Sequence, residues 1–202
     1  MADPALPAQP LHDGGALFVH VRVLLGIITG LGLTHLLRNF ADLMDRPAKR
    51  TYWIHLAWAL YVFLYVLHFW WWEFRLSLLN PWSVNVYMFI TLYALLLYLL
   101  CAFTFSARID EYPGYREYFY TRRHWFFGLL AAIFLVDMWD TWIKGARHFQ
   151  DLGIEYPVRN ITHVALCLVA MKTRNPAFHS VFVLAALAYE ITWILRAFEF
   201  VG

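Results

Sequence analysis

Long apolar runs alternate along the chain with short polar segments. The clearest run, Trp53–Trp72, is apolar all round a helix and carries tryptophan or tyrosine at both ends. About twenty helical residues rise about 30 Å, which is the thickness of a bilayer's hydrocarbon core. Tryptophan and tyrosine also favour the level of the lipid headgroups. We therefore predict that this segment spans a membrane.

Five further apolar runs repeat the pattern, separated by short segments with proline, asparagine and charged residues. The first run is the least regular, because His20, Arg22 and His35 interrupt it. The sequence predicts an all-α integral membrane bundle of six transmembrane helices, forming one domain over residues 16–202 after a flexible tail at residues 1–15. The predicted spans are residues 16–37, 53–72, 82–105, 124–142, 158–171 and 178–200.

Two finer features belong to this prediction. Gly26, Gly30 and Gly32 in the first span are spaced to let a neighbouring helix approach closely. Residues 106–123 mix charges with tyrosines, which fits a segment in the membrane interface and fits a plain polar loop equally well.

Composition agrees with a membrane protein. The 202 residues are 61% hydrophobic and 15% charged, whereas a soluble domain is about half apolar and a quarter charged. The net charge of +2 and the scattered basic residues argue against nucleic-acid binding. The predicted partner is the lipid bilayer, with a homo-oligomer or a membrane-complex partner left open. Cys101 and Cys167 fall in apolar runs and are predicted to be buried packing residues.

Basic residues predict the orientation. Six spans place both termini on one side of the membrane. The segments after the first, third and fifth spans hold ten of the 16 lysines and arginines, and such residues favour the cytoplasmic side. We therefore expect both termini outside, in a bacterial inner membrane.

Ionisable residues within the spans are the candidates for function, because a charge inside a membrane is costly and usually marks an ion or proton path. Glu190 lies about halfway along the sixth span with no basic residue within one turn, so it needs a proton or a partner from another helix. We predict His163 as that partner, since both lie at similar depth. His179 shares the same stripe of the sixth span as Glu190.

Two more helices carry candidates. Asp137, Asp140 and Lys144 share one stripe, so Asp140 is expected to pair with Lys144, and Asp137, one turn deeper, is a candidate to face a water-filled vestibule. On the fifth span, Asn160, His163 and Cys167 share one helix face. This face is predicted to point into the bundle. The complete set of candidates for an ion or proton path is Glu190, His163, His179, Asp137, Asp140, His68 and Asn160.

Nine histidines raise the question of haem b, which needs two facing imidazoles at equal depth. His55 and His68 are offset by about 140° on their helix, so they cannot both point toward a second pair. A single haem is geometrically conceivable between His68 and either His20 or His163. No other metal site is expected.

No catalytic motif is recognisable: the sequence has no HExxH, desaturase-type histidine box, GxSxG, phosphate-binding loop or GxGxxG. We therefore name no reaction and do not expect an enzyme. The leading hypothesis is a pathway for protons or a small ion, including a proton-coupled transporter. Two alternatives stay open, namely a haem-binding or pigment-binding redox subunit and a non-catalytic assembly or scaffold subunit.

Overall fold

The computed structural model describes residues 14–45, 51–78, 83–105 and 109–198. All regular elements of these segments are helices. Seven are α-helices and two, η1 and η2, are short 3-10 helices. In chain order they are α1 (Gly14–Asp45), α2 (Trp53–Trp72), η1 (Glu73–Leu78), α3 (Val84–Thr104), η2 (Ile109–Glu111), α4 (Tyr115–Ile143), α5 (Ala146–Asp151), α6 (Glu155–Lys172) and α7 (Pro176–Phe198).

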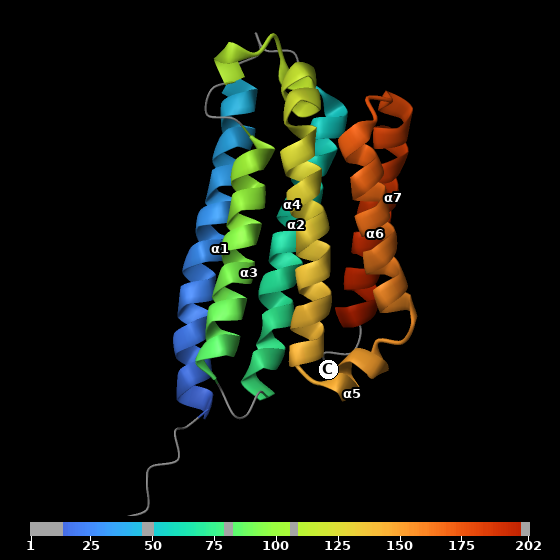
Figure 1. Ribbon diagram of the computed structural model, residues 1–202. Helices are drawn as coiled ribbons and strands as arrows, with labels where there is room; N and C mark the ends of the chain where they lie inside the picture. Colours follow the sequence, from blue (N-terminus) through green and yellow to red (C-terminus); the bar gives the residue numbers. More distant parts are fainter. Residues whose placement is uncertain (1–13, 46–50, 79–82, 106–108, 199–202) are drawn as a thin grey trace, which may run out of the picture.

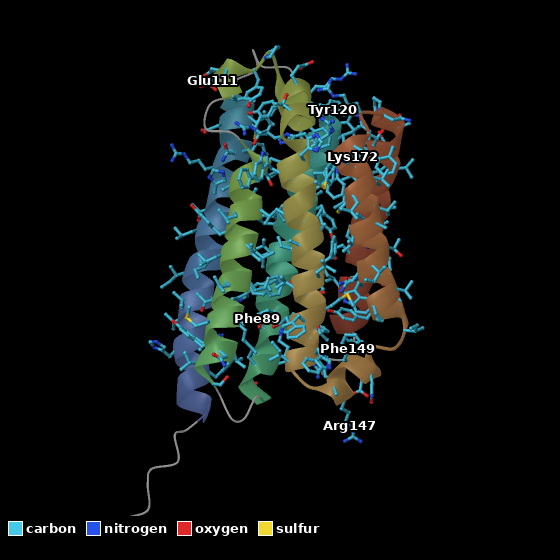
Figure 2. All side chains as sticks on the ribbon, viewed as in Figure 1. Phe89, Glu111, Tyr120, Arg147, Phe149 and Lys172 are labelled. Atoms are coloured by element: carbon cyan, nitrogen blue, oxygen red, sulfur yellow. The ribbon has the colours of Figure 1, made fainter. Side chains whose placement is uncertain are left out.

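The long helices α1, α2, α3, α4, α6 and α7 lie side by side as a bundle, and the short α5 lies at one end of it (Figure 1). That end is called the α5 end. The start of α1 and the end of α7 both lie there (Figure 1). Arg147 on α5 and Lys172 at the end of α6 mark the two opposite ends of the bundle (Figure 2).

Five of the long helices are long and apolar enough to cross a membrane: α1, α2, α3, α4 and α7. Their outward faces carry exposed large apolar residues such as Leu31, Leu92, Leu135 and Val181. The chain is therefore an all-α integral membrane protein in contact with lipid, as predicted. The sixth predicted span corresponds to α6, which is not among the five and holds Glu155, Arg159 and Lys172 within its 18 residues.

Helix packing places the aromatic residues in the interior. The most extensive contacts are between α4 and α6 and between α1 and α3, whereas α6 touches its sequence neighbour α7 little, and α7 packs mainly on α2. The Trp58 ring on α2 lies 5.1 Å from Phe127 and 4.9 Å from Phe182 between ring centroids. Together with Phe126, these buried rings form what is called the aromatic layer.

Two of the three glycines predicted to allow close approach of a neighbouring helix do permit close helix contacts. A Cβ atom at Gly26 would lie 3.1 Å from the Trp70 ring, and one at Gly32 would lie 3.1 Å from the Cys101 sulfur. At Gly30 no atom would lie within 4 Å. The predicted close approach is therefore correct for Gly26 and Gly32 and wrong for Gly30, because the faces that touch α2 and α3 do not include Gly30.

Helix α4 begins at Tyr115, well before the predicted start of the fourth span at residue 124. Most of the segment predicted as interface or loop is thus helical, although residues 106–108 lie outside the described residues. Tyr118 and Phe119 are buried on one face of this first part, and the Tyr118 hydroxyl donates to the Phe103 carbonyl at 2.8 Å. The buried face was not recognised in the sequence because charged residues alternate with the aromatic ones in this segment.

Helix α1 also extends further than predicted, from Gly14 to Asp45. The Asn39 side chain donates to the His35 carbonyl at 2.7 Å, and the Phe40 ring packs on Phe105. Packing against the rest of the bundle therefore continues beyond the predicted end of the span. The tail predicted at residues 1–15 lies outside the described residues up to residue 13.

Candidate functional site

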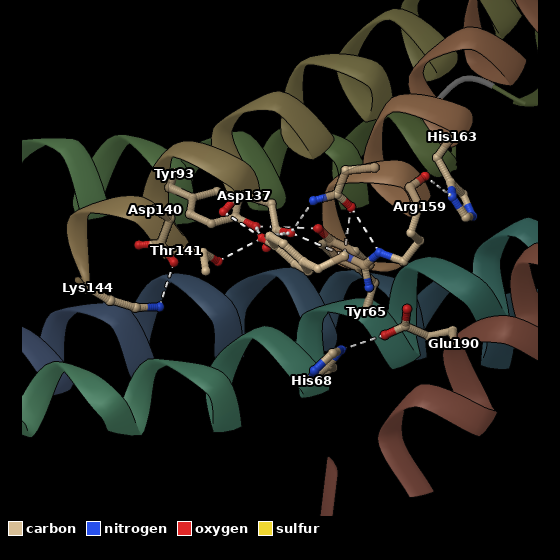
Figure 3. A network of polar contacts seen from close by, with 12 residues as sticks. Tyr65, His68, Tyr93, Asp137, Asp140, Thr141, Lys144, Arg159, His163 and Glu190 are labelled. Atoms are coloured by element: carbon tan, nitrogen blue, oxygen red, sulfur yellow. Dashed lines mark hydrogen bonds and ion pairs between the residues drawn. The ribbon is translucent and has the colours of Figure 1, made fainter. Parts of the chain in front are cut away.

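Asp137 lies near the end of α4, in the half of the bundle nearer the α5 end (Figure 1). It is the centre of a group of hydrogen bonds (Figure 3). Its carboxylate accepts from the Tyr93 hydroxyl at 3.1 Å and from the Tyr156 hydroxyl at 2.7 Å. It also accepts from Arg159 Nη2 at 3.2 Å and from Asn160 Nδ2 at 3.0 Å. These five residues are called the Asp137 cluster. They join α3, α4 and α6 around one half-buried carboxylate.

Arg159 is held on several sides within this cluster. Its Nε and Nη2 donate to the Asn160 side-chain oxygen at 2.9 and 2.7 Å. The guanidinium carbon lies 5.2 Å from the ring centroid of Tyr156 and 5.3 Å from that of Trp193. Aromatic faces attract a planar, delocalised cation, so these rings replace part of the hydration that Arg159 lacks.

Glu190 on α7 pairs with His68 on α2, at 2.7 Å between Oε1 and Nδ1. Only 3% of the Glu190 side chain and 11% of the His68 side chain are exposed. The prediction that His163 is the partner of Glu190 is therefore wrong, because α7 packs against α2 more than against α6. His163 instead meets the carbonyl of Arg159 through Nδ1 at 2.9 Å.

A third ionic group lies near the ends of α2 and α4. Lys144 Nζ donates to Asp140 Oδ2 at 2.5 Å and to Glu73 Oε1 at 2.8 Å, and all three side chains are buried. The predicted pair of Asp140 and Lys144 is thus confirmed, and Glu73 is an additional member that the sequence did not reveal. Although burial lowers the pKa of Lys144, the two carboxylates outweigh it and raise that pKa above its ordinary value.

A small cavity lies between the Asp137 cluster and His68. Its lining includes His68, Asp137, Arg159, Tyr65 and Trp193. The volume of the cavity is about 20 Å³, counted as the region that the centre of a water molecule can occupy. This suffices for a water molecule or a group of similar size. Asp137 therefore does lie beside a cavity, and its filling by water stays a prediction.

The predicted inward face of α6 is present: Asn160 and Cys167 are fully buried and His163 is half-buried. His179, by contrast, lies toward the opposite end of the bundle. Its Nε2 donates to the Thr173 carbonyl at 3.2 Å, and its ring stacks on Phe127 of the aromatic layer.

Although His179 and Glu190 share a buried stripe of α7, apolar residues fill the stripe between them. Phe182, Val183, Ala186 and Leu187 are the buried residues of this interval. His179 is therefore not brought together with the other candidates.

The histidines proposed for haem have different surroundings in the structure. His20 lies on the exposed surface of α1, whereas His68 and His163 point into the bundle, toward Glu190 and the Arg159 carbonyl. Within the described segments, no group of three or more His, Cys, Asp or Glu side chains is placed to hold a metal ion.

Sequence reasoning also missed residues that complete the site. Arg159 was visible as a charge inside a span, but Tyr93 and Tyr156 resemble ordinary interfacial aromatics in the sequence. The only sequence feature that pointed to Tyr93 and Tyr156 was their predicted depth in the membrane, which is similar to that of Asp137. Their hydroxyl groups are required because a carboxylate inside a bundle needs several donors.

A titratable residue on α5 predicts a pH dependence of stability. His148 is 8% exposed, and its ring lies 5.5 Å from that of Trp72. Burial, followed by the charges of Arg75 and Lys144, lowers its pKa from 6.5 to about 4. A lowered histidine pKa favours the neutral folded form. Its contribution to stability is thus complete above pH 6.5 and is lost as the pH falls toward about 4.

We expect the unfolding free energy of the detergent-solubilised protein to fall by about 2–3 kcal/mol from this group over that range, since one pKa unit corresponds to about 1.4 kcal/mol. The measurement is denaturant unfolding at several pH values for the wild type and for His148→Gln. The glutamine variant should show a shallower pH slope. An identical slope in both proteins would contradict the assignment to His148.

Fold and site together define the class of this chain: an all-α integral membrane protein whose interior ionisable side chains gather mainly in one half of the bundle. No protein-family model, curated protein or solved structure matches the chain.

Proposed function

We propose that the protein is a proton-coupled transporter, with the pair of His68 and Glu190 as its proton-binding site. The observation that carries this proposal is the buried contact at 2.7 Å between an imidazole and a carboxylate on two different helices. A carboxylate and an imidazole in contact can share a proton and transfer it. Because they join α2 to α7, a change in their protonation acts directly on helix packing.

Coupled transport fits the geometry better than an open proton channel does. The interior on the side of His179 is closed by the aromatic layer, in which Trp58, Phe127 and Phe182 are buried. The phenyl rings offer no donors or acceptors to relay a proton, and the Trp58 indole offers a donor but no acceptor, so a proton at Glu190 needs a rearrangement of helices to cross. Alternating access supplies such a rearrangement.

We propose that α6 is the sixth span. Its buried polar residues, Arg159 and Asn160, face the bundle, while Ile161, Leu168 and Val169 are exposed apolar residues suited to lipid. Glu155 and Lys172 are the first and last residues of the helix, where headgroups and water can solvate them. Charges in these positions are compatible with a helix that crosses the bilayer.

Both termini are proposed to face outward from a bacterial inner membrane, on the basis of the lysine and arginine count. A cysteine added near Gly14 should react with a membrane-impermeant maleimide in intact cells, and one added near Pro113 should not. The native Cys101 and Cys167 are both buried, which keeps the background low. The reverse labelling pattern would refute this orientation.

The test of proton binding is Glu190→Gln, which keeps the shape of the side chain but cannot titrate. We expect the infrared difference spectrum between pH 5 and pH 8 to lose a protonated-carboxyl signal in this variant. Under a pH gradient with small solutes supplied, proteoliposomes of the variant should take up protons at least about a hundred times more slowly, the typical minimum contribution of a proton-transfer group.

The matched control is Glu155→Gln, because Glu155 on α6 is an exposed carboxylate that also pairs with a residue of α7, Arg196, at 2.8 Å. It should behave as the wild type in both measurements. If Glu190→Gln folds normally and keeps the infrared signal and the proton flux, the proposal fails. The polar residues would then serve helix assembly, which is the scaffold alternative. A visible absorption band in the purified protein would instead favour the redox alternative.

A further inference from the structure

We infer that the cavity beside Arg159 binds a small monovalent anion, about the size of formate, and that each anion enters with one proton. This inference rests on the proposed function and specifies its substrate class. Three observations carry it: an unused donor of Arg159, the balance of charge around the cavity, and the size and lining of the cavity.

The first observation concerns the guanidinium group. Arg159 uses Nε and Nη2 for Asn160 and Asp137. No hydrogen-bond acceptor for Nη1 is present among the described residues. Nη1 is also not one of the fully enclosed atoms that lack a partner, so it borders open space. Arg159 is 8% exposed and lines the cavity, and Figure 3 shows its guanidinium end directed toward the pair of His68 and Glu190.

This arrangement leaves a cationic donor available to a ligand. The Asp137 carboxylate is already satisfied by four donors, so it holds Arg159 in place without covering the whole guanidinium group. Hydrogen bonds from an ionised donor to an anion are about twice as strong as neutral ones. An anion in the cavity would therefore find a preorganised N–H donor and a fixed positive charge.

The second observation is the charge balance. Arg159 and Asp137 together are neutral, and the pair of His68 and Glu190 is neutral too, whichever of the two holds the proton that they share. A monovalent anion added to this buried site leaves one uncompensated negative charge, which is costly in a low dielectric. One further proton bound by the pair of His68 and Glu190 removes that charge. The stoichiometry that keeps the site neutral is one proton for each anion.

The third observation limits the ligand. The centre of a water molecule can occupy only about 20 Å³ of the cavity, so only a very small ion fits without movement of side chains. Rings of Tyr65, Phe69 and Trp193 line much of the remainder. These walls disfavour multivalent, strongly hydrated ions such as sulfate, because an apolar wall cannot replace their hydration.

The experiment measures binding by tryptophan fluorescence, since Trp72 and Trp193 line the cavity. The purified protein is titrated with sodium formate, sodium chloride and sodium sulfate at pH 6 and pH 8. We expect saturable binding of formate, no saturable binding of sulfate, and a formate affinity up to about a hundred times weaker at pH 8, the limit for one coupled proton. Saturation by sulfate with the same affinity as formate would overturn the inference.

Variants assign the site. Arg159→Gln should abolish formate binding, whereas Arg196→Gln, which changes an exposed arginine on α7, should leave it unchanged. Because Arg159→Gln leaves Asp137 without its cation and can impair folding, the neutral double variant Asp137→Asn with Arg159→Gln is measured as well. Formate binding that persists in a folded variant without Arg159 would overturn the inference.

Glu190→Gln separates this inference from the proposed function. It should still bind formate but lose the difference between pH 6 and pH 8. If the wild type shows the Glu190 infrared signal and binds no formate, the anion site is wrong and the proton site stands. If formate binds equally at both pH values, the coupling of anion to proton is wrong.

Discussion

Replacing Asp137 with leucine is expected to destabilise the folded protein by about 3–5 kcal/mol, the range for removing one partner of a buried ion pair. The variant leaves the Arg159 charge 8% exposed, without the carboxylate that lies 3.2 Å from its Nη2. It also removes an acceptor from Tyr93 and from Asn160. Thermal unfolding in detergent, followed by circular dichroism, is the measurement.

The control removes both charges. The double variant Asp137→Leu with Arg159→Met should recover most of the lost stability, because two apolar residues in contact leave no unpaired charge inside the bundle. Tyr156 keeps a hydrogen bond to the Thr141 hydroxyl at 2.7 Å in either variant. If the double variant is as unstable as Asp137→Leu alone, the penalty comes from lost packing, and the ionic explanation fails.

Replacing Lys144 with methionine is expected to lower the unfolding free energy by a similar amount, about 3–5 kcal/mol. Here the buried charges left without a partner are negative, whereas Asp137→Leu leaves a positive one. The change leaves the Asp140 and Glu73 carboxylates, 0% and 4% exposed, without their shared cation. Because protonation removes the repulsion between two carboxylates, the variant should regain stability as the pH falls from 8 to 5. Thermal unfolding across that range is the measurement.

Glu73→Gln is the matched control for this prediction. It keeps an oxygen that accepts from Lys144, and it leaves the close pair of Lys144 and Asp140 intact. Its effect on the unfolding free energy should be below about 1.5 kcal/mol, because it removes only the charge of one carboxylate. A Lys144→Met variant that is no less stable than Glu73→Gln would show that Lys144 does not hold this end of the bundle together.

The features that the sequence determined are local ones. Twenty-residue apolar runs fix the long helices, since any segment in hydrocarbon has to satisfy its own backbone hydrogen bonds. The pair of Asp140 and Lys144 was predictable because residues four apart meet on every α-helix. For the same reason the inward face of α6, with Asn160 and Cys167 buried, followed from residue spacing alone.

Only the tertiary structure decided which helices face each other and at what rotation. The short connection between α6 and α7 suggested that His163 would meet Glu190, but α7 packs mainly on α2, and the partner is His68. Likewise, the spacing of Gly26 and Gly30 could not reveal that Gly26 contacts another helix and Gly30 does not. These choices depend on how all the large side chains of the bundle fill space together, and that fit is not encoded within any single helix.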